Sequence, residues 1–350
     1  MRVLVTGGAG FVGSHLVDLL IEKGHSVVVY DNLSSGRAVF LQHHLDSGSP
    51  VEVVKADLLD LNSIKAAMDG VEMVFHLAAQ SLVQRSYSDP VTTFETNTLG
   101  MVNLLDCVRT RPWIEVAVLI TSDKAYRNDE WCWGYRETDP LGGHDPYSGS
   151  KGCAELVANS YYHSFLRHSG TRVATTRAGN VIGGGDWANN RIIPDCVRSW
   201  SKNKKAELRN PSATRPWQHV LEAVGGYLCL AINLSFNKHL HGEAFNFGPN
   251  LSREYSVLEL VKTMGVYWKN ISWKVMPKSR KKFYESELLR LNCNKAKKIL
   301  KWKNILKFSE TVEMVASWYR SYYDHPKNID KITKKQIREY EKLLKKRLIK

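Results

Sequence analysis

Short apolar runs that alternate with helical patterns are the feature that most limits how this chain of 350 residues can fold. Between the runs lie stretches with apolar residues at helical spacing, such as Leu16, Leu19 and Leu20. Nearly all-apolar strands joined by helices are typical of a parallel sheet covered on both faces, so the sequence predicts a doubly wound α/β fold. The expected strands are 2–7, 25–32, 51–58, 71–79, 116–123 and 171–180.

The pattern becomes irregular near residue 180, where Gly, Asn, Pro and Trp are frequent. We interpret these residues as loops that build a smaller, interleaved C-terminal lobe for the substrate. The expected division is a dinucleotide-binding domain at 1–179 with part of 220–250 returning to it, a substrate lobe mainly at 180–325, and a basic helical tail at 326–350.

The formal net charge of +14 is unevenly distributed along the chain. Residues 1–261 hold 24 basic and 27 acidic side chains, a net of −3, whereas residues 262–350 hold 25 and 8, a net of +17. Within the latter, 331–350 hold 9 basic and 2 acidic residues around Ile337, Leu344 and Leu348, which predicts an exposed amphipathic helix. A solvated Lys-rich surface is the simplest interpretation; an acidic partner, an anionic membrane surface or attraction of an anionic substrate remain open.

Other patterns exclude several classes of protein. No stretch reaches the roughly 18–20 apolar residues of a membrane helix, and the N-terminus runs directly into the first expected strand, which argues against a signal peptide. The six cysteines are scattered and form no CxxC pair, so we expect reduced thiols in a cytoplasmic protein, with no disulfide scaffold and no metal site.

A glycine-rich loop follows the first expected strand and precedes a helix. Gly7, Gly10 and Gly13 give the spacing GxxGxxG, which lets a backbone turn approach a pyrophosphate at a helix N-terminus. Asp31 ends the second expected strand, where a carboxylate binds ribose hydroxyls and repels a 2′-phosphate; an ordinary turn aspartate is the alternative. The loop therefore predicts NAD as cofactor. Further expected cofactor contacts are Phe11, Val12, Asn32, Asp57, Leu58, Leu77, Ala78 and Ala79, together with Tyr147 and Lys151.

Tyr147 and Lys151 form a YxxxK motif that would share one face of a helix. A free tyrosine titrates near 10, too high for a base at neutral pH, but a nearby ammonium and a nicotinamide cation would both favour the phenolate. Tyr147 could then take a proton from a sugar hydroxyl while hydride leaves the same carbon. Ser122, which closes an upstream strand, completes a Ser/Tyr/Lys trio.

This trio, together with the glycine loop, resembles the short-chain dehydrogenase/reductase superfamily in its extended, nucleotide-sugar-modifying branch. The segments TSDKAY, WGYRETDPLGGHDPYSGSKGCAEL, GNVIGGGDWA and RNPSATRPWQHVLE closely resemble the CDP-glucose 4,6-dehydratase family. The resemblance covers roughly residues 1–323, and its most specific parts are the loops around 121–151 and 179–222.

The resemblance implies a reaction and roles for several residues. CDP-glucose would be oxidised at C4, lose water across C5 and C6, and receive the hydride back at C6, so that NAD is regenerated. Asp123 would protonate the departing C6 hydroxyl, and Lys124 would assist removal of the C5 proton. Arg215 and Asn180 match residues that contact the substrate diphosphate in related enzymes, whereas Arg191 and Arg209 are anion-facing candidates that could equally be surface arginines.

The region Thr93–Thr110 and the helix carrying Tyr147–Leu166 resemble the pair that forms a four-helix dimer interface in this superfamily, which implies a homodimer or a higher homo-oligomer. We expect neither a nucleic-acid partner nor a membrane span.

Two alternatives stay open. The loop TGGAGFVGS, where the family usually has TGHTGFKGS, and the segment DNLS are closer to sugar epimerases, which would make the chain a nucleotide-sugar 4-epimerase. A nucleic-acid-binding or scaffold protein is motivated only by the basic segment.

Overall fold

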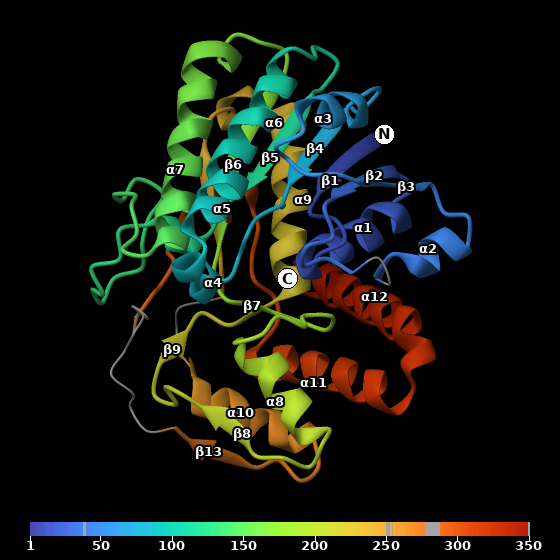
Figure 1. Ribbon diagram of the computed structural model, residues 1–350, viewed down its shortest axis with the longest axis vertical. Helices are drawn as coiled ribbons and strands as arrows, with labels where there is room; N and C mark the ends of the chain where they lie inside the picture. Colours follow the sequence, from blue (N-terminus) through green and yellow to red (C-terminus); the bar gives the residue numbers. More distant parts are fainter. Residues whose placement is uncertain (38–39, 250–252, 254, 277–287, 349–350) are drawn as a thin grey trace.

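A seven-stranded sheet forms the centre of the computed structural model, which describes residues 1–37, 40–249, 253, 255–276 and 288–348 (Figure 1). All of its neighbouring strands run parallel. The order is β3-β2-β1-β4-β5-β6-β11. The strands are β1 (Arg2–Thr6), β2 (Ser26–Asp31), β3 (Val51–Lys55), β4 (Met73–His76), β5 (Val116–Ile120), β6 (Arg172–Ala178) and β11 (Ala244–Phe247).

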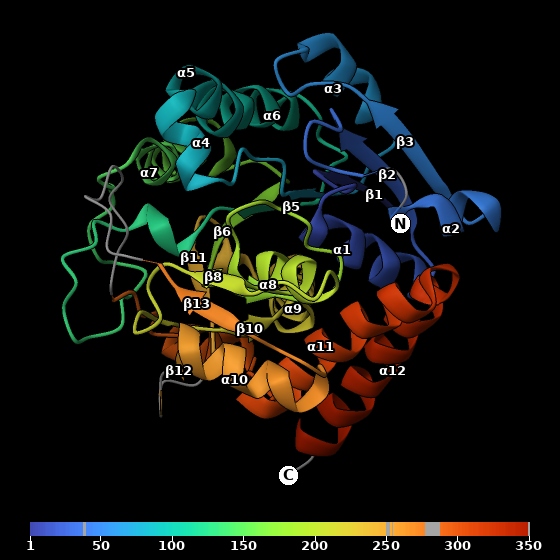
Figure 2. The same cartoon turned by 60° about the horizontal axis from the view of Figure 1, so that its bottom comes forward.

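Helices cover both faces of this sheet (Figure 2). Because side chains alternate along a strand, Val116 and Val118 of β5 enter one hydrophobic cluster while Ala117 and Leu119 enter another. The first cluster lies under α1 (Phe11–Glu22) and α9 (Val220–Phe236). The second lies under α3 (Leu61–Ala67), α6 (Gly100–Arg109) and α7 (Pro146–Tyr161). The doubly wound α/β fold predicted from the sequence is therefore confirmed.

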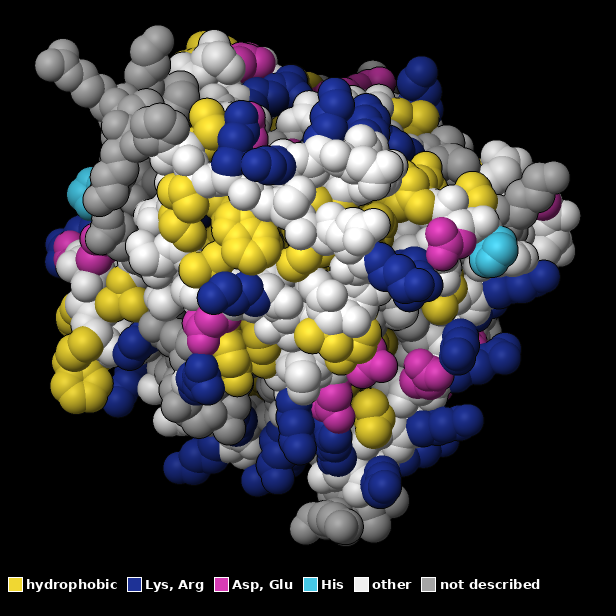
Figure 3. All heavy atoms as spheres, turned by 90° about the horizontal axis from the view of Figure 1, so that it is seen from below, with side chains coloured by type: hydrophobic (Ala, Val, Ile, Leu, Met, Phe, Trp, Pro, Cys, Tyr) yellow, Lys and Arg dark blue, Asp and Glu magenta, His cyan; other side chains and the backbone are white. Residues whose placement is uncertain are grey.

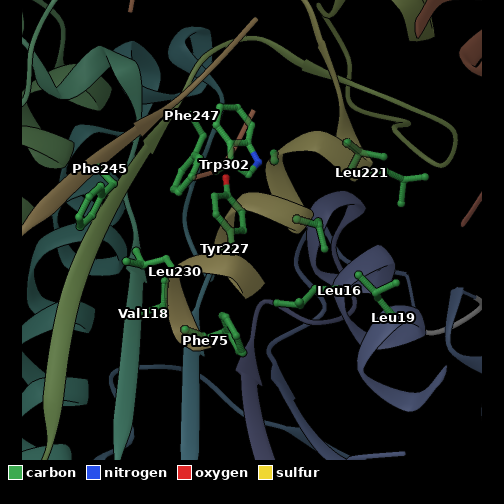
Figure 4. Packing of buried hydrophobic residues seen from close by; sticks show 14 of the residues in the cluster. Leu16, Leu19, Phe75, Val118, Leu221, Tyr227, Leu230, Phe245, Phe247 and Trp302 are labelled. Atoms are coloured by element: carbon green, nitrogen blue, oxygen red, sulfur yellow. The ribbon is translucent and has the colours of Figure 1, made fainter. Parts of the chain in front are cut away.

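Figure 4 shows the packing of the first cluster. Leu16 of α1 and Tyr227 and Leu230 of α9 are almost fully buried, and they lie over Phe75 and Val118 of the sheet. Apolar residues at helical spacing on α1 and α9 therefore find a common apolar surface on the strands.

The strand order reverses between β1 and β4, because β2 and β3 lie on one side of β1 and β4, β5 and β6 on the other. In open parallel sheets ligands bind outside the carboxyl ends of the strands at such a reversal. The glycine loop after β1 and the residues after β4 and β5 all lie at this edge.

A smaller lobe lies beyond the carboxyl ends of the strands (Figure 1). It has its own hydrophobic cluster, to which Trp200, Leu260 and Tyr319 contribute. Its helices are α8 (Ile192–Trp200), α10 (Val257–Tyr267) and α11 (Phe308–Asp324). Its short strands are β7 (Val181–Ile182), β8 (Ala206–Leu208), β9 (Thr214–Arg215), β10 (Gln218–His219), β12 (Tyr255–Ser256) and β13 (Trp273–Val275).

Short helical segments complete the described chain. The π-helical turns among the described residues are η2 (Glu95–Leu99), which lies between α5 and α6, η4 (Tyr162–Leu166), which continues α7, and the isolated η6 (Ala296–Leu300). The other segments are α2 (Gln42–Asp46), α4 (Val83–Ser88), α5 (Pro90–Phe94), η3 (Asp123–Ala125), η5 (Lys238–Leu240) and η7 (Pro326–Asn328).

The final helix, α12 (Ile329–Leu348), forms where the sequence predicts a helix, but the expectation that it is exposed is wrong for its inner face. Ile337 and Tyr340 are buried, and the Tyr340 hydroxyl donates to Glu222 Oε2 at 3.0 Å, which ties α12 to α9. The helix also packs on α11. Its lysines lie on the side of the helix that faces away from α9 and α11. Figure 3 views the molecule from the side of the smaller lobe and shows Lys and Arg side chains spread over that surface.

Among the described residues, no helix is both long enough and apolar enough to cross a bilayer.

Candidate active site

The glycine loop between β1 and α1 leaves no room for side chains. Gly7 has a φ of +71°, and a Cβ there would stand 2.7 Å from the backbone nitrogen of Ala78. A Cβ on Gly13 would stand 2.1 Å from the Gly7 carbonyl oxygen. Gly10 caps α1, whose first turn holds Phe11 and Val12, so free backbone N–H groups face the loop. This cradle fits the pyrophosphate of a dinucleotide.

Asp31 lies at the end of β2, beside the glycine loop. Its Oδ2 accepts a hydrogen bond from the Ala9 backbone nitrogen at 3.0 Å, and its Oδ1 accepts one from Leu33 at 2.8 Å. Burial raises the pKa of this carboxyl, while the two backbone hydrogen bonds act against the rise. The carboxylate is therefore held at the place where an adenosine ribose would meet the loop.

The remaining expected cofactor contacts surround this loop. Asn32 donates to Asp57 Oδ2 at 2.7 Å, which joins the ends of β2 and β3. Leu58 turns its side chain into the second hydrophobic cluster, so only its backbone is available to a ligand. Leu77, Ala78 and Ala79 follow β4 as a partly buried segment. The glycine loop, Asp31 and the residues around them therefore fit NAD. Which of these residues contact the cofactor stays a prediction.

Replacing Asp31 by alanine is expected to weaken NAD binding about tenfold or more, because both the ribose acceptor and the anchor of the Ala9 turn are lost. The same change should reduce discrimination against NADP. Both are measured by titrating each dinucleotide into the stripped protein. Asp60→Ala is the matched control, because Asp60 only caps α3; equal losses in the two variants would contradict the assignment.

Ser122 and Asp123 begin the short helix η3 directly after β5. The Ser122 hydroxyl donates to Asp123 Oδ1 at 3.1 Å and accepts from the Lys124 backbone nitrogen at 3.2 Å. Asp123 is 4% exposed, and its Oδ2 has no hydrogen-bond partner among the described residues. Burial raises the pKa of Asp123, although Lys124, Ser122 and Arg215 act in the opposite direction. A buried carboxyl of this kind favours its protonated form.

Tyr147 and Lys151 lie one turn apart near the start of α7. Asp145 fixes that start, because its Oδ1 accepts from the Ser148 backbone nitrogen at 2.9 Å. Both side chains are buried: burial raises the pKa of Tyr147 to about 12, against the Ser122 hydrogen bond, and lowers the pKa of Lys151 to about 8. The predicted trio of Ser122, Tyr147 and Lys151 is thus brought together at one edge of the sheet. A cationic ligand beside Tyr147 would lower this raised pKa.

Glu155 and Arg177 form a buried ion pair next to this trio that the sequence analysis missed. Arg177 Nε donates to Glu155 Oε1 at 2.8 Å, and Thr121 and Thr175 donate to the same carboxylate. Glu155 follows Lys151 by four residues on α7, and its charge raises the pKa of Lys151 against the effect of burial. The four-residue spacing could have placed Glu155 on the helix face of Lys151, but nothing in the local sequence marks its pairing with Arg177.

The expected substrate contacts lie on the lobe side of the site. Arg191 Nη1 donates to Asp186 Oδ2 at 3.1 Å and Nη2 to Ser81 Oγ at 3.0 Å, which bridges the lobe and the loop after β4. The charge of Arg191 also lowers the pKa of Tyr147 against burial. Arg215 ends β9 and acts electrostatically on Asp123. Arg209 is exposed, and its guanidinium donates to the backbone carbonyl of Asn190. The backbone carbonyl of Asn180 accepts a hydrogen bond from the backbone nitrogen of Gln218.

One group of described side chains has the composition of a metal site. Asp18, His43 and His44 offer three ligand atoms, but both imidazoles already hydrogen-bond to Asp18 Oδ1, at 3.1 Å and 2.7 Å. The group lies between α1 and α2, away from Tyr147 and Asp123.

Comparisons with known proteins show the family of the chain. A model of the GDP-mannose 4,6-dehydratase family matches residues 4–315. The chain is 40% identical over 329 residues to the CDP-glucose 4,6-dehydratase of Salmonella typhimurium, covering 92% of this chain and 91% of that protein.

Among solved structures, a dTDP-glucose 4,6-dehydratase of Streptomyces venezuelae with NAD bound is similar at a TM-score of 0.79, 26% identity, and 93% and 99% coverage of the two chains. The UDP-glucose 4-epimerase of Thermotoga maritima reaches 0.78 at 25% identity, with 92% and 99% coverage. The chain therefore belongs to the GDP-mannose 4,6-dehydratase family, within the extended short-chain dehydrogenase/reductase superfamily, and is an NAD-dependent nucleotide-sugar 4,6-dehydratase.

Proposed function

We propose that this protein converts CDP-glucose to CDP-4-keto-6-deoxyglucose. The observation that carries the proposal is Asp123, a buried carboxyl held by Ser122 within the Tyr147 site, with its pKa raised. A 4-epimerase only oxidises and reduces one carbon, and has no use for an acid at this place. The 40% identity to a CDP-glucose 4,6-dehydratase supports CDP-glucose as the substrate.

Tyr147 carries the first step. Its phenolate takes the proton of the C4 hydroxyl, and Ser122 holds the same hydroxyl in place. Bound NAD supplies the redox chemistry, by accepting hydride from C4 and returning it to C6. The positive charge of Lys151, one turn along the helix, would favour the phenolate. The carboxylate of Glu155 favours the charged form of Lys151.

Asp123 and Lys124 carry the elimination. The 4-keto group acidifies the proton on C5, which Lys124 removes. Asp123 gives its proton to the C6 hydroxyl as the C6–O bond breaks, and water leaves. Lys124 returns a proton to C5 when hydride reaches C6.

The protons balance over one cycle. Tyr147 gains the proton of the C4 hydroxyl, and Asp123 has spent one proton on the leaving water. Ser122 hydrogen-bonds to Asp123 and lies beside Tyr147, so its hydroxyl offers a path by which the phenol can restore the acid. The net reaction is the loss of one water from the sugar, with no change in the cofactor.

Cationic side chains on the lobe side would hold the diphosphate. Arg215 is suited to bidentate contact with phosphate, and Asn180 would donate its amide to the diphosphate-sugar. Arg191 and Arg209 are further candidates, with Arg191 nearer the reacting carbons because it acts on Tyr147.

A substrate screen tests the proposal. CDP-, dTDP-, GDP- and UDP-glucose are each incubated with the purified protein, and the 4-keto product is followed by its alkali-induced absorbance. We expect turnover with CDP-glucose to exceed the others. Equal turnover of all four would contradict the nucleotide assignment.

We also propose that the protein is a homodimer through α5, η2 and α7. These elements expose apolar side chains on adjacent surfaces: Phe94 and Leu99 are 39% and 45% exposed, and Leu156 is 60% exposed. Exposed apolar side chains on neighbouring elements are typical of a subunit interface.

Replacing Phe94 and Leu156 together by glutamate is expected to give monomers, because buried unpaired carboxylates would oppose association. Light scattering measures the mass. Phe236→Glu changes an exposed aromatic residue at the end of α9 and should leave the dimer intact. A wild-type monomer, or a double variant that stays dimeric, would contradict this interface.

All six cysteines are free thiols, which supports a cytoplasmic location for the enzyme.

A further inference from the structure

Three polar side chains that the mechanism leaves unused meet between α1 and α2. His43 and His44 of α2 each place Nε2 beside Oδ1 of Asp18 on α1, at 3.1 Å and 2.7 Å. Consecutive positions on a helix normally point in different directions, yet the centroids of these two rings lie only 4.0 Å apart. The two imidazole nitrogens and the carboxylate are therefore gathered around one point.

Two imidazoles and a carboxylate are a ligand set that suits a divalent transition-metal ion such as Zn²⁺. The three ligand atoms lie within 4.8 Å of one another. Neighbouring ligand atoms around a tetrahedral Zn²⁺ stand about 3.3 Å apart, because Zn–N and Zn–O bonds are about 2.0–2.2 Å long. The cluster therefore needs only a small outward shift to admit the ion. Ca²⁺ and Mg²⁺ prefer oxygen ligands, so the imidazoles select against them.

Ser49 supports one of these ligands from behind. Its hydroxyl oxygen lies 3.4 Å from His44 Nδ1, and its backbone nitrogen donates to the His44 carbonyl at 3.0 Å, which holds the serine beside the ring. An imidazole that binds a metal through Nε2 carries its proton on Nδ1, and an acceptor at Nδ1 fixes the ring in that state. Ser49 Oγ is placed to be that acceptor.

The cluster is enclosed on one side and open on the other. The side chains of Asp18 and His44 are 9% and 4% exposed, whereas that of His43 is 21% exposed. The two buried ligands would shield the ion from solvent, and the side of His43 offers a path by which the ion and a water ligand enter.

We propose that Asp18, His43 and His44 form a binding site for one divalent transition-metal ion, with Zn²⁺ as the probe that identifies it. The ligands are Nε2 of both imidazoles and a carboxylate oxygen of Asp18. On binding, each neutral imidazole carries its proton on Nδ1 instead of Nε2, and bonds to the ion replace the two hydrogen bonds to Asp18. The site uses none of the cysteines on which the sequence expectation of no metal site was based.

The ion would be structural, because its ligands join two helices of the dinucleotide-binding domain. The segment that leads from β2 to α2 also contacts the glycine loop, where the Arg37 backbone nitrogen donates to the Ala9 carbonyl at 2.9 Å. Fastening α2 to α1 would therefore restrain this segment at its α2 end as well, and binding of the ion to the folded state alone stabilises that state.

Titration of the NAD-loaded, tag-free protein with Zn²⁺ against a competing chromophoric indicator tests the site. His44→Gln should lower the affinity of one equivalent of Zn²⁺ about a hundredfold or more, because a glutamine amide can donate to Asp18 but is a poor metal ligand. A hundredfold excess of Zn²⁺ over its dissociation constant should raise the unfolding temperature of the wild type by about 3 °C or more, and leave that of the variant unchanged. His239→Gln removes an exposed imidazole on η5 and is the matched control, which should behave like the wild type in both measurements.

Ser49→Ala keeps all three ligands and should lower the Zn²⁺ affinity about tenfold, through the lost acceptor alone. The proposal is overturned if the wild type binds no Zn²⁺, or if His44→Gln binds it as tightly as the wild type; the cluster is then a hydrogen-bonded network only. Displacement of the bound Zn²⁺ by an equal concentration of Mg²⁺ would also overturn it, because the imidazoles would then not be ligands. Metal content and unfolding temperature do not depend on turnover, so failure of the CDP-glucose assignment would leave these expectations unchanged.

Discussion

Replacing Tyr147 by phenylalanine is expected to lower kcat by about 10³-fold, with no reduced nicotinamide formed on addition of CDP-glucose. In the proposed mechanism the phenol takes the C4 hydroxyl proton. It lies buried beside Ser122 and one turn from Lys151. Without that base the first oxidation cannot begin, so every later step is lost as well. Stopped-flow absorbance of the nicotinamide and product analysis measure the effect.

Tyr161→Phe is the matched control for this experiment, since Tyr161 ends the same helix and is only partly buried. It should retain wild-type turnover. A Tyr147→Phe variant that still reduces its nicotinamide at the normal rate would contradict the assignment of Tyr147 as the base.

Replacing Asp123 by asparagine is expected to stop the reaction halfway. Asparagine has a similar shape but cannot give a proton to the C6 hydroxyl, so elimination should slow by about 10³-fold. The oxidation at C4 uses Tyr147 and should proceed, which leaves the nicotinamide reduced. The measurement is the near-ultraviolet absorbance of the bound cofactor together with the absence of 4-keto-6-deoxy product.

The pH dependence of elimination follows from the same residue. The acid must be protonated, and burial raises the pKa of Asp123 above its ordinary value, so the active form persists to higher pH than a surface aspartate would allow. The elimination rate should therefore fall as pH rises through that raised pKa. Asp129→Asn changes an exposed carboxylate in the following loop and should leave the profile unchanged; a matching shift would contradict the assignment.

Much of this architecture could be read from local sequence patterns. The apolar runs predicted β1 to β6, because the central strands of a parallel sheet are buried on both faces and are largely apolar. The glycine spacing predicted the loop at Gly7 and Gly13, where any Cβ would meet the backbone. The YxxxK spacing placed Tyr147 and Lys151 on one helix, and strand order then brought Ser122 to them.

Other features depend on contacts between distant segments. The pattern around Ile337 predicted an amphipathic helix, but only the fold shows that its apolar face packs against α11 and α9. Glu155 and Arg177 pair across a helix and a strand, which no local spacing reveals. His43 and His44 read as ordinary polar residues until the fold shows that both imidazoles reach Asp18 on another helix.

Transfer of deuterium from C4 tests the central claim most directly. CDP-glucose labelled with deuterium at C4 is incubated with the purified protein, and the product is analysed by mass spectrometry and NMR. A 4,6-dehydratase moves the label to C6 of a product that has lost one water. A product of unchanged mass, with its label still on an epimerised C4, would show instead that the chain is an epimerase and that Asp123 is not its acid.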